Sequence, residues 1–123
     1  MIDSSDVCTY CGALATDRDH VVPVAYQGVR YFTSSNWVWA CSECNSFLVD
    51  QMLVTVQDRA AFLAERLAKR YRRVINMPHW TQEELSELGD RMRMEVQRGL
   101  KMKRLVAQRI ENCRIVSRHG VPA

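Results

Sequence analysis

The segments CTYC at residues 8–11 and CSEC at residues 41–44 each separate two cysteines by two other residues. This gap lets both thiolates of a pair reach one ion from a tight turn, and two pairs complete a tetrahedral site of four sulfur ligands. A redox CxxC motif uses one pair and normally lies in a βαβ unit, which the sequence does not indicate. The pattern therefore predicts one structural zinc ion with four ligands, Cys8, Cys11, Cys41 and Cys44.

The spacer between the two cysteine pairs, residues 12–40, is longer than the spacer of a common zinc ribbon, which has about 15–20 residues. We therefore expect additional structure to lie between the pairs. A segment this small is marginally stable without a metal or disulfide, and a structural zinc ion adds on the order of 10 kcal/mol of apparent binding free energy. Four thiolates also fill the coordination of the ion, so any reaction must occur elsewhere.

Charge is distributed unevenly along the 123 residues. Residues 1–50 carry two basic and six acidic side chains, whereas residues 51–123 carry 15 of the 17 basic side chains and eight acidic ones. A basic half of this kind suggests a polyanion as partner, and the alternative is a solvated helix surface. The segment MIDSSDVC resembles no secretory signal, and no apolar run reaches membrane-spanning length, so we expect a protein of the reducing cytoplasm.

Between the cysteine pairs, the sequence predicts a strand at 20–24, an irregular connection at 25–36 and a second strand at 37–40. A helix is expected at about 42–52. Trp37 and Trp39 are two residues apart and so share one face of a strand. We interpret these two residues as core in preference to a base-stacking platform.

Four pieces of sequence, taken in order, resemble the zinc-bearing branch of the HNH (ββα-metal) endonucleases. They are CTYCG at 8–12, DHVVP at 19–23, Asn36, and CSECN at 41–45. The resemblance covers about residues 8–50, and it is nearest to small HNH proteins of bacteriophages and bacteria. It implies an α+β fold, in which residues 1–52 form a zinc-stabilised ββα-metal module and residues 53–123 form an Arg-rich helical extension.

The resemblance also implies residue roles. Asp19 and Asn45 would bind one catalytic Mg²⁺ or Mn²⁺ ion, His20 would act as general base, and Asn36 would brace the connection that orients the imidazole. Many family members have a lysine three residues after the position of Asn45, where this chain has Leu48. The implied activity is hydrolysis of DNA phosphodiester bonds with low sequence specificity, leaving 5′-phosphate and 3′-hydroxyl ends.

These residue types suit that chemistry. A neutral imidazole titrates near neutral pH and can take a proton from water. A carboxylate and an amide oxygen are hard ligands suited to Mg²⁺, which keeps several waters and accepts a phosphate oxygen. We therefore expect His20 to stay off the metal, since coordination would use its lone pair.

Two helices are predicted in the extension, at about 56–76 and 82–117. Thr55 is a candidate N-cap for the first helix, and Pro78 prevents its continuation. Thr81 and Glu84 form a capping box at the start of the second helix. The longer helix exceeds the N-terminal module in length, so part of it must face solvent, DNA, a second subunit or another protein. Gly99 allows a kink near its middle.

Basic side chains of both helices are candidates for sequence-independent phosphate contacts. The predicted set is Arg66, Lys69, Arg70, Arg72, Arg73, Lys101, Lys103 and Arg104. DNA is the expected partner, in a bacterial or phage-infected cell. Two alternatives stay open: a dimeric nuclease specific for branched DNA, and a non-catalytic zinc module that binds DNA or joins a larger phage protein complex.

Overall fold

A computed structural model describes residues 7–21 and 37–121, and every statement below concerns these residues. The predicted α+β class is confirmed, with one small antiparallel sheet and several helices. The elements are β1 (Asp17–His20), β2 (Trp37–Ala40), α1 (Ser42–Leu48), α2 (Val56–Arg70), α3 (Arg72–Ile75), α4 (Gln82–Ser86) and α5 (Asp90–His119).

The sheet pairs β1 with β2, with Asp19 opposite Val38 and His20 opposite Trp37. The second strand was predicted correctly, whereas β1 begins at Asp17, three residues before the predicted start, and residues 22–24 lie outside the described part. Directly opposed residues share a face of the sheet. Asp17 and Asp19 therefore face the same side as Val38 and Ala40.

The other face of the sheet carries Arg18, His20 and the two tryptophans. Trp37 and Trp39 are only half-buried, and their rings meet edge to face, with centroids 5.1 Å apart. The guanidinium of Arg18 lies over both rings, at 4.8 and 5.7 Å from the centroids. The prediction that the tryptophans are core is therefore wrong, because the buried core of the module lies on the opposite face of the sheet.

Helix α1 is shorter than the predicted 42–52 segment and ends at Leu48. Thr55 caps α2 as predicted, accepting a hydrogen bond from the amide of Asp58 at 3.1 Å. The predicted helix at 56–76 divides at Tyr71, whose φ of −105° and ψ of 25° are not helical. Its two parts are α2 and the short α3.

The predicted helix at 82–117 also divides. The capping box of Thr81 and Glu84 is present, but α4 has only five residues, and α5 starts after Gly89. The 30 residues of α5 continue as one helix through Gly99. At 1.5 Å per residue this helix is about 45 Å long.

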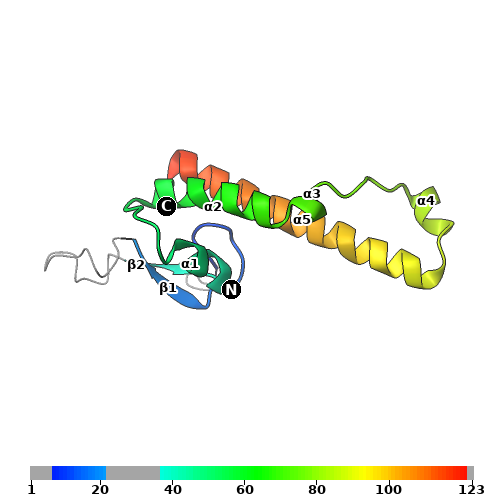
Figure 1. Cartoon of the computed structure of the whole chain (residues 1–123), viewed down its shortest axis with the longest axis horizontal. Coiled ribbons are helices and arrows are strands. Elements are labelled where there is room, and N and C mark those ends of the chain that lie inside the picture. The colour runs from blue at the N-terminus through cyan, green and yellow to red at the C-terminus, as the bar shows by residue number, and fades with distance from the viewer. Residues whose placement is uncertain (1–6, 22–36, 122–123) are drawn as a thin grey trace, which may run out of the picture.

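Helices α2 and α5 pack against each other, and the other elements are arranged around this pair (Figure 1). Helix α2 runs beside the C-terminal half of α5, while the other half of α5 extends away with α4 at its far end. The two-stranded sheet and α1 lie against one side of this helix pair. Leu63 and Leu67 of α2 and Val106 and Ile110 of α5 are buried in the same core as the cysteines.

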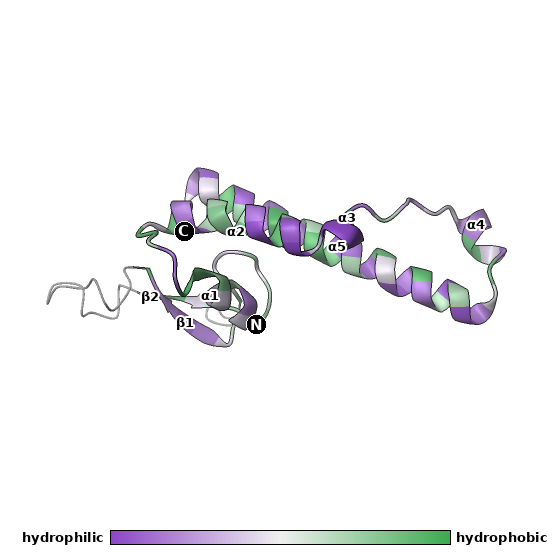
Figure 2. Ribbon diagram, in the orientation of Figure 1, coloured by the Kyte–Doolittle hydropathy of each residue, from purple (hydrophilic) through white to green (hydrophobic). Residues whose placement is uncertain are grey.

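Hydropathy along the ribbon agrees with this packing, since green and purple residues alternate around α2 and α5 (Figure 2). The extending half of α5 is mixed in character and carries exposed Met92, Met94 and Met102. Within residues 7–21 and 37–121, no helix combines the length and the apolar character needed to span a membrane.

Candidate metal centre

The four paired cysteines converge on one point in the fold. All four Sγ atoms lie within 4.8 Å of one another, and every one of these residues is buried. Four sulfurs at 2.3 Å from a zinc ion form a tetrahedron with edges of about 3.8 Å. The Sγ atoms of Cys11 and Cys41, one from each pair, are 3.7 Å apart. The cluster therefore has the ligand type, number and spacing of a structural zinc site.

Local backbone geometry holds each cysteine pair in a ligand-binding turn. The amide of Cys11 donates to the Sγ atom of Cys8 at 3.5 Å, and the amide of Cys44 donates to the Sγ atom of Cys41 at 3.4 Å. Gly12 completes the first turn with a φ of +80°, a conformation that residues with a side chain rarely adopt. The amide of Thr9 bonds the carbonyl of Trp39 at 2.8 Å, which joins the first turn to β2.

Arg109 of α5 contacts the cluster, which the sequence did not predict. Its Nε and one terminal nitrogen donate to the sulfurs of Cys11 and Cys41, at 3.3 and 3.7 Å. The other terminal nitrogen lies 2.8 Å from the carboxylate of Glu43. Burial opposes the charge on Arg109, but the hydrogen bond to Cys11 and the charges of Cys11 and Glu43 raise the pKa of the guanidinium above its usual value.

Hydrogen bonds among the four thiols shift their pKa values in opposite directions, raising the pKa of Cys8 and Cys44 and lowering that of Cys11. The pKa of Cys11 is lowered from its usual value because its sulfur accepts hydrogen bonds from the thiols of Cys41, Cys44 and Cys8, with a further contribution from Arg109. Cys113 of α5, predicted as a lone and partly buried thiol, is fully buried beside this region. Burial raises the pKa of Cys113 to about 12, so this thiol stays protonated.

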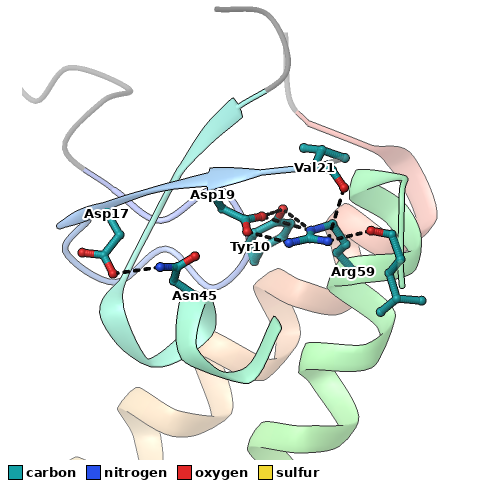
Figure 3. Close-up of polar contacts among 7 residues, drawn as sticks. Tyr10, Asp17, Asp19, Val21, Asn45 and Arg59 are labelled. Atoms are coloured by element: carbon teal, nitrogen blue, oxygen red, sulfur yellow. Dashed lines mark hydrogen bonds and ion pairs between the residues drawn. The ribbon is translucent and has the colours of Figure 1, made fainter. Parts of the chain in front are cut away.

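Asp19, a predicted ligand of the catalytic metal, is buried in an ion pair with Arg59 of α2 (Figure 3). The Nε atom of Arg59 donates to the carboxylate at 3.0 Å, and the hydroxyl of Tyr10 donates to the same oxygen. Arg59 also donates to the carbonyl of Leu53 at 2.6 Å. This network occupies the carboxylate that the resemblance assigns to a metal ion.

Asn45, the second predicted ligand, lies on the face of the sheet that carries Asp19. Its amide nitrogen donates to the carboxylate of Asp17 at 3.1 Å (Figure 3). The structure thus joins Asn45 by a hydrogen bond to the carboxylate two residues before the predicted one, whereas the hydrogen bonds of the Asp19 carboxylate come from Tyr10 and Arg59. Asp17 and Asn45 are only partly buried, so this carboxylate and amide lie near solvent.

His20, the predicted general base, is exposed at the end of β1. Strand alternation places its side chain on the face opposite Asp19, with Arg18 and the two tryptophans. The chain bends only at the next residue, Val21. Asn36, the predicted brace, lies outside the described residues.

The predicted phosphate-binding side chains fall into two groups. Arg66, Lys69 and Arg70 line a groove of about 380 Å³ with Phe47, over whose ring Arg66 lies at 5.2 Å from the centroid. Arg72 and Arg73 are exposed on α3, next to this groove.

The second group lies near the middle of α5. Lys101, Lys103 and Arg104 line a groove of about 700 Å³ beneath the segment that carries His79 and Trp80. Lys103 also donates to the carbonyl of Met77 at 2.7 Å, so it holds this segment to α5. The structure does not gather the predicted basic side chains on a single surface.

Comparisons of the chain with models of known protein families, with curated proteins and with solved structures found no match.

Proposed function

We propose that the chain is a zinc-stabilised, metal-dependent endonuclease that acts on DNA. The observation that carries the proposal is the four-cysteine cluster. Its geometry fits zinc, and its cysteines lie in the turn before β1 and at the start of α1, the two elements that carry the other described motif residues. Asn45 directly follows the ligand Cys44 and faces the strand that carries Asp17, Asp19 and the exposed His20.

In this proposal, His20 takes the proton from the attacking water after its imidazole, at the end of β1, turns toward the face that carries Asn45. Its exposure leaves the imidazole open to solvent and substrate, as a general base requires. Asn45 and a carboxylate on the same face of β1 would hold the divalent ion, which stabilises charge on the phosphate and leaving oxygen when bound. Asp17 already lies beside Asn45, whereas Asp19 can take this role only by releasing Arg59.

The test is nicking of a supercoiled plasmid with Mg²⁺ or Mn²⁺ by the zinc-loaded protein. His20→Ala should lower the rate about 100- to 10,000-fold, the usual contribution of a general base. His79→Ala, at another exposed histidine, should leave the rate unchanged. Equal nicking by the wild type and His20→Ala would refute the assignment of His20.

Variants of the two carboxylates identify the metal ligand. Asp17→Asn should weaken nicking in a way that excess metal partly restores, because Asp17 is the carboxylate in contact with Asn45. If Asp19→Asn instead shows this rescue while remaining folded, the ligand is Asp19, as the resemblance implies. No rescue of either variant would contradict a metal site on this face.

A non-catalytic zinc module that binds DNA is the second candidate, and one observation favours it. The Asp19 carboxylate is occupied by Arg59 and Tyr10, and His20 lies on the opposite face, so the motif side chains do not converge in this state. This candidate predicts a salt-sensitive mobility shift of duplex DNA, with no nicking at any concentration of Mg²⁺ or Mn²⁺.

A further inference from the structure

Arg109 joins the two cysteine pairs through one guanidinium group. Its two sulfur contacts go to Cys11 of the first pair and Cys41 of the second, which are 30 residues apart in sequence. Only 18% of the Arg109 side chain is exposed, so these contacts are made in a largely desolvated setting. Arg109 thus connects the C-terminal helix to ligands from both halves of the metal centre.

Charge explains why an arginine suits this position. Four thiolates around Zn²⁺ leave a net charge of −2, which is costly to bury without a compensating cation. Hydrogen bonds to ligand sulfurs spread that charge and orient the ligands. A guanidinium has a planar fork of donors that can reach two sulfurs and a carboxylate together, whereas a lysine ammonium is a single point of charge.

Glu43 holds the guanidinium in place from within the second cysteine pair. Its carboxylate pairs with Arg109 and with Arg70 of α2, each at 2.8 Å. It also accepts a hydrogen bond from the hydroxyl of Tyr71 at 2.6 Å. Glu43, which lies between Cys41 and Cys44, therefore forms ion pairs with both long helices.

The next turn of α5 contacts the first cysteine pair. The side-chain amide of Asn112 donates to the carbonyl of Tyr10, between Cys8 and Cys11, at 2.8 Å. Cys113, four residues after Arg109 and on the same face of the helix, is fully buried in the core that contains the four clustered cysteines. The docking surface of α5 is thus built on the metal centre itself.

We propose that Arg109 is a positioning residue of the zinc site, and that zinc binding and the docking of α5 stabilise each other. This inference rests on the proposed zinc occupancy. The metal holds the two cysteine turns at the spacing that Arg109 spans, and the docked arginine compensates the charge of the thiolates. Loss of either partner weakens the other.

The first experiment measures zinc affinity by competition with a chromogenic chelator. Arg109→Met keeps an unbranched apolar stem and a similar helix propensity but removes the charge and the hydrogen-bond donors. It should bind zinc about 10- to 100-fold more weakly, the usual effect of removing a partner of a metal ligand. Arg109→Lys should fall between Arg109→Met and the wild type. The matched control is Arg114→Met, at an exposed arginine of the same helix, which should match the wild type.

Cobalt substitution gives an independent readout. The thiolate-to-Co²⁺ charge-transfer bands should shift in Arg109→Met relative to the wild type, because two sulfurs lose hydrogen bonds, and they should not shift in Arg114→Met. Circular dichroism confirms that each variant is folded, and if Arg109→Met is not, Arg109→Lys carries the comparison.

Hydrogen exchange tests the reciprocal effect in the wild-type protein. After chelation, the α5 amides from 106 to 116 should exchange much faster than the same amides do in the zinc-loaded protein. Exchange at 91–98, in the extending half of α5, should change much less.

These outcomes separate the inference from the proposed zinc site. A wild type that binds no zinc at one equivalent overturns both. A wild type that binds zinc, together with an Arg109→Met affinity within twofold of it, overturns only the role of Arg109. Unchanged exchange at 106–116 after chelation overturns the link to α5.

Discussion

Two arginines, Arg59 and Arg109, lie on the buried faces of their helices. Arg59 is only 2% exposed and stands four residues before the core residue Leu63. Arg109 follows the buried Val106 by three residues and precedes Cys113 by four. Each guanidinium is matched by anionic groups, a carboxylate in one case and thiolates with a carboxylate in the other. Burial of the charges is therefore compensated in both places.

Removing the Arg59 charge should destabilise the fold strongly. Arg59→Met leaves the Asp19 carboxylate and the Tyr10 hydroxyl buried without their cation. Breaking a buried ion pair in this way costs about 3–5 kcal/mol, and this loss should appear in the free energy of unfolding in urea.

Arg66→Met, at an exposed arginine of α2, is the matched control and should change the free energy of unfolding by about 0.5 kcal/mol or less. A small effect of Arg59→Met would mean that Asp19 does not depend on Arg59, which would leave this carboxylate available for metal. The same variant therefore also informs the assignment of the metal ligand.

At this scale, the sequence predicted the helix caps of Thr55 and Thr81 because each depends on residues a few positions apart. It predicted the four clustered cysteines because two local Cys-x-x-Cys pairs together supply the four ligands of one zinc ion. It did not predict the roles of Arg59 and Arg109, whose partners are 40 and 98 residues away. One signal was present, since both arginines occupy the apolar stripe of their helix. An arginine at such a position indicates a buried anionic partner but does not identify it.

At the scale of secondary structure, the sequence predicted helices in the right places and of the right type, but each long helix proved to be two. Tyr71 ends α2, and its hydroxyl bonds Glu43, so a tertiary contact accompanies the break. Gly89 separates α4 from α5. The start of β1 was misplaced because residues 17–19 are polar, although the strand buries Asp19 through an ion pair in place of an apolar side chain.

Gly99 lies in the middle of α5, where glycine is unfavourable. Gly99→Ala should raise the free energy of unfolding by about 0.5–1 kcal/mol, since alanine loses less backbone entropy on entering a helix. A Cβ atom at this position would lie 2.6 Å from Cε of Met77, at the flexible end of that side chain, which can move aside. Urea denaturation checks the prediction.

Met77→Ala, alone and combined with Gly99→Ala, provides the control. If Met77 moves freely, Gly99→Ala should have the same effect in both backgrounds. A destabilising Gly99→Ala that becomes stabilising once Met77 is shortened would show that the contact between α5 and residue 77 is tight.

At the scale of the molecule, the cysteine cluster and the helix pair share one core. Tyr10, Leu48, Leu63 and Val106 come from four different segments and are all fully buried. Sequence patterns predicted the cysteine cluster and the helices but not that they share one core. No local pattern specifies which face of α5 covers the cysteine turns. The proposed zinc ion should therefore stabilise more of the core than its four candidate ligands.

Zinc removal should expose Cys113 to alkylation, although this thiol is not a predicted ligand. Cys113 is fully buried in the structure, and burial raises the pKa of its thiol to about 12, so iodoacetamide at pH 8 should react slowly with Cys113 in the zinc-loaded protein. After chelation, α5 loses the contacts of Arg109 and Asn112, and the reaction should accelerate. Mass spectrometry of the alkylated protein counts the modified thiols.

Cys113→Ala separates this effect from modification of the ligands. The variant should show one modified thiol fewer than the wild type after chelation. Continued protection of Cys113 without zinc would mean that the helix pair holds its core independently of the metal.

The contact between Arg109 and both cysteine pairs also has a consequence for the order of events during synthesis. Arg109 is added 68 residues after Cys41, which at about 5–20 residues per second is an interval of roughly 3–14 s. Throughout that interval the nascent chain carries the four clustered cysteines without the part of α5 that contacts them. The proposed zinc ion should therefore be able to bind before α5 docks, and the four thiols should be most open to oxidation or to another metal until Arg109 is added.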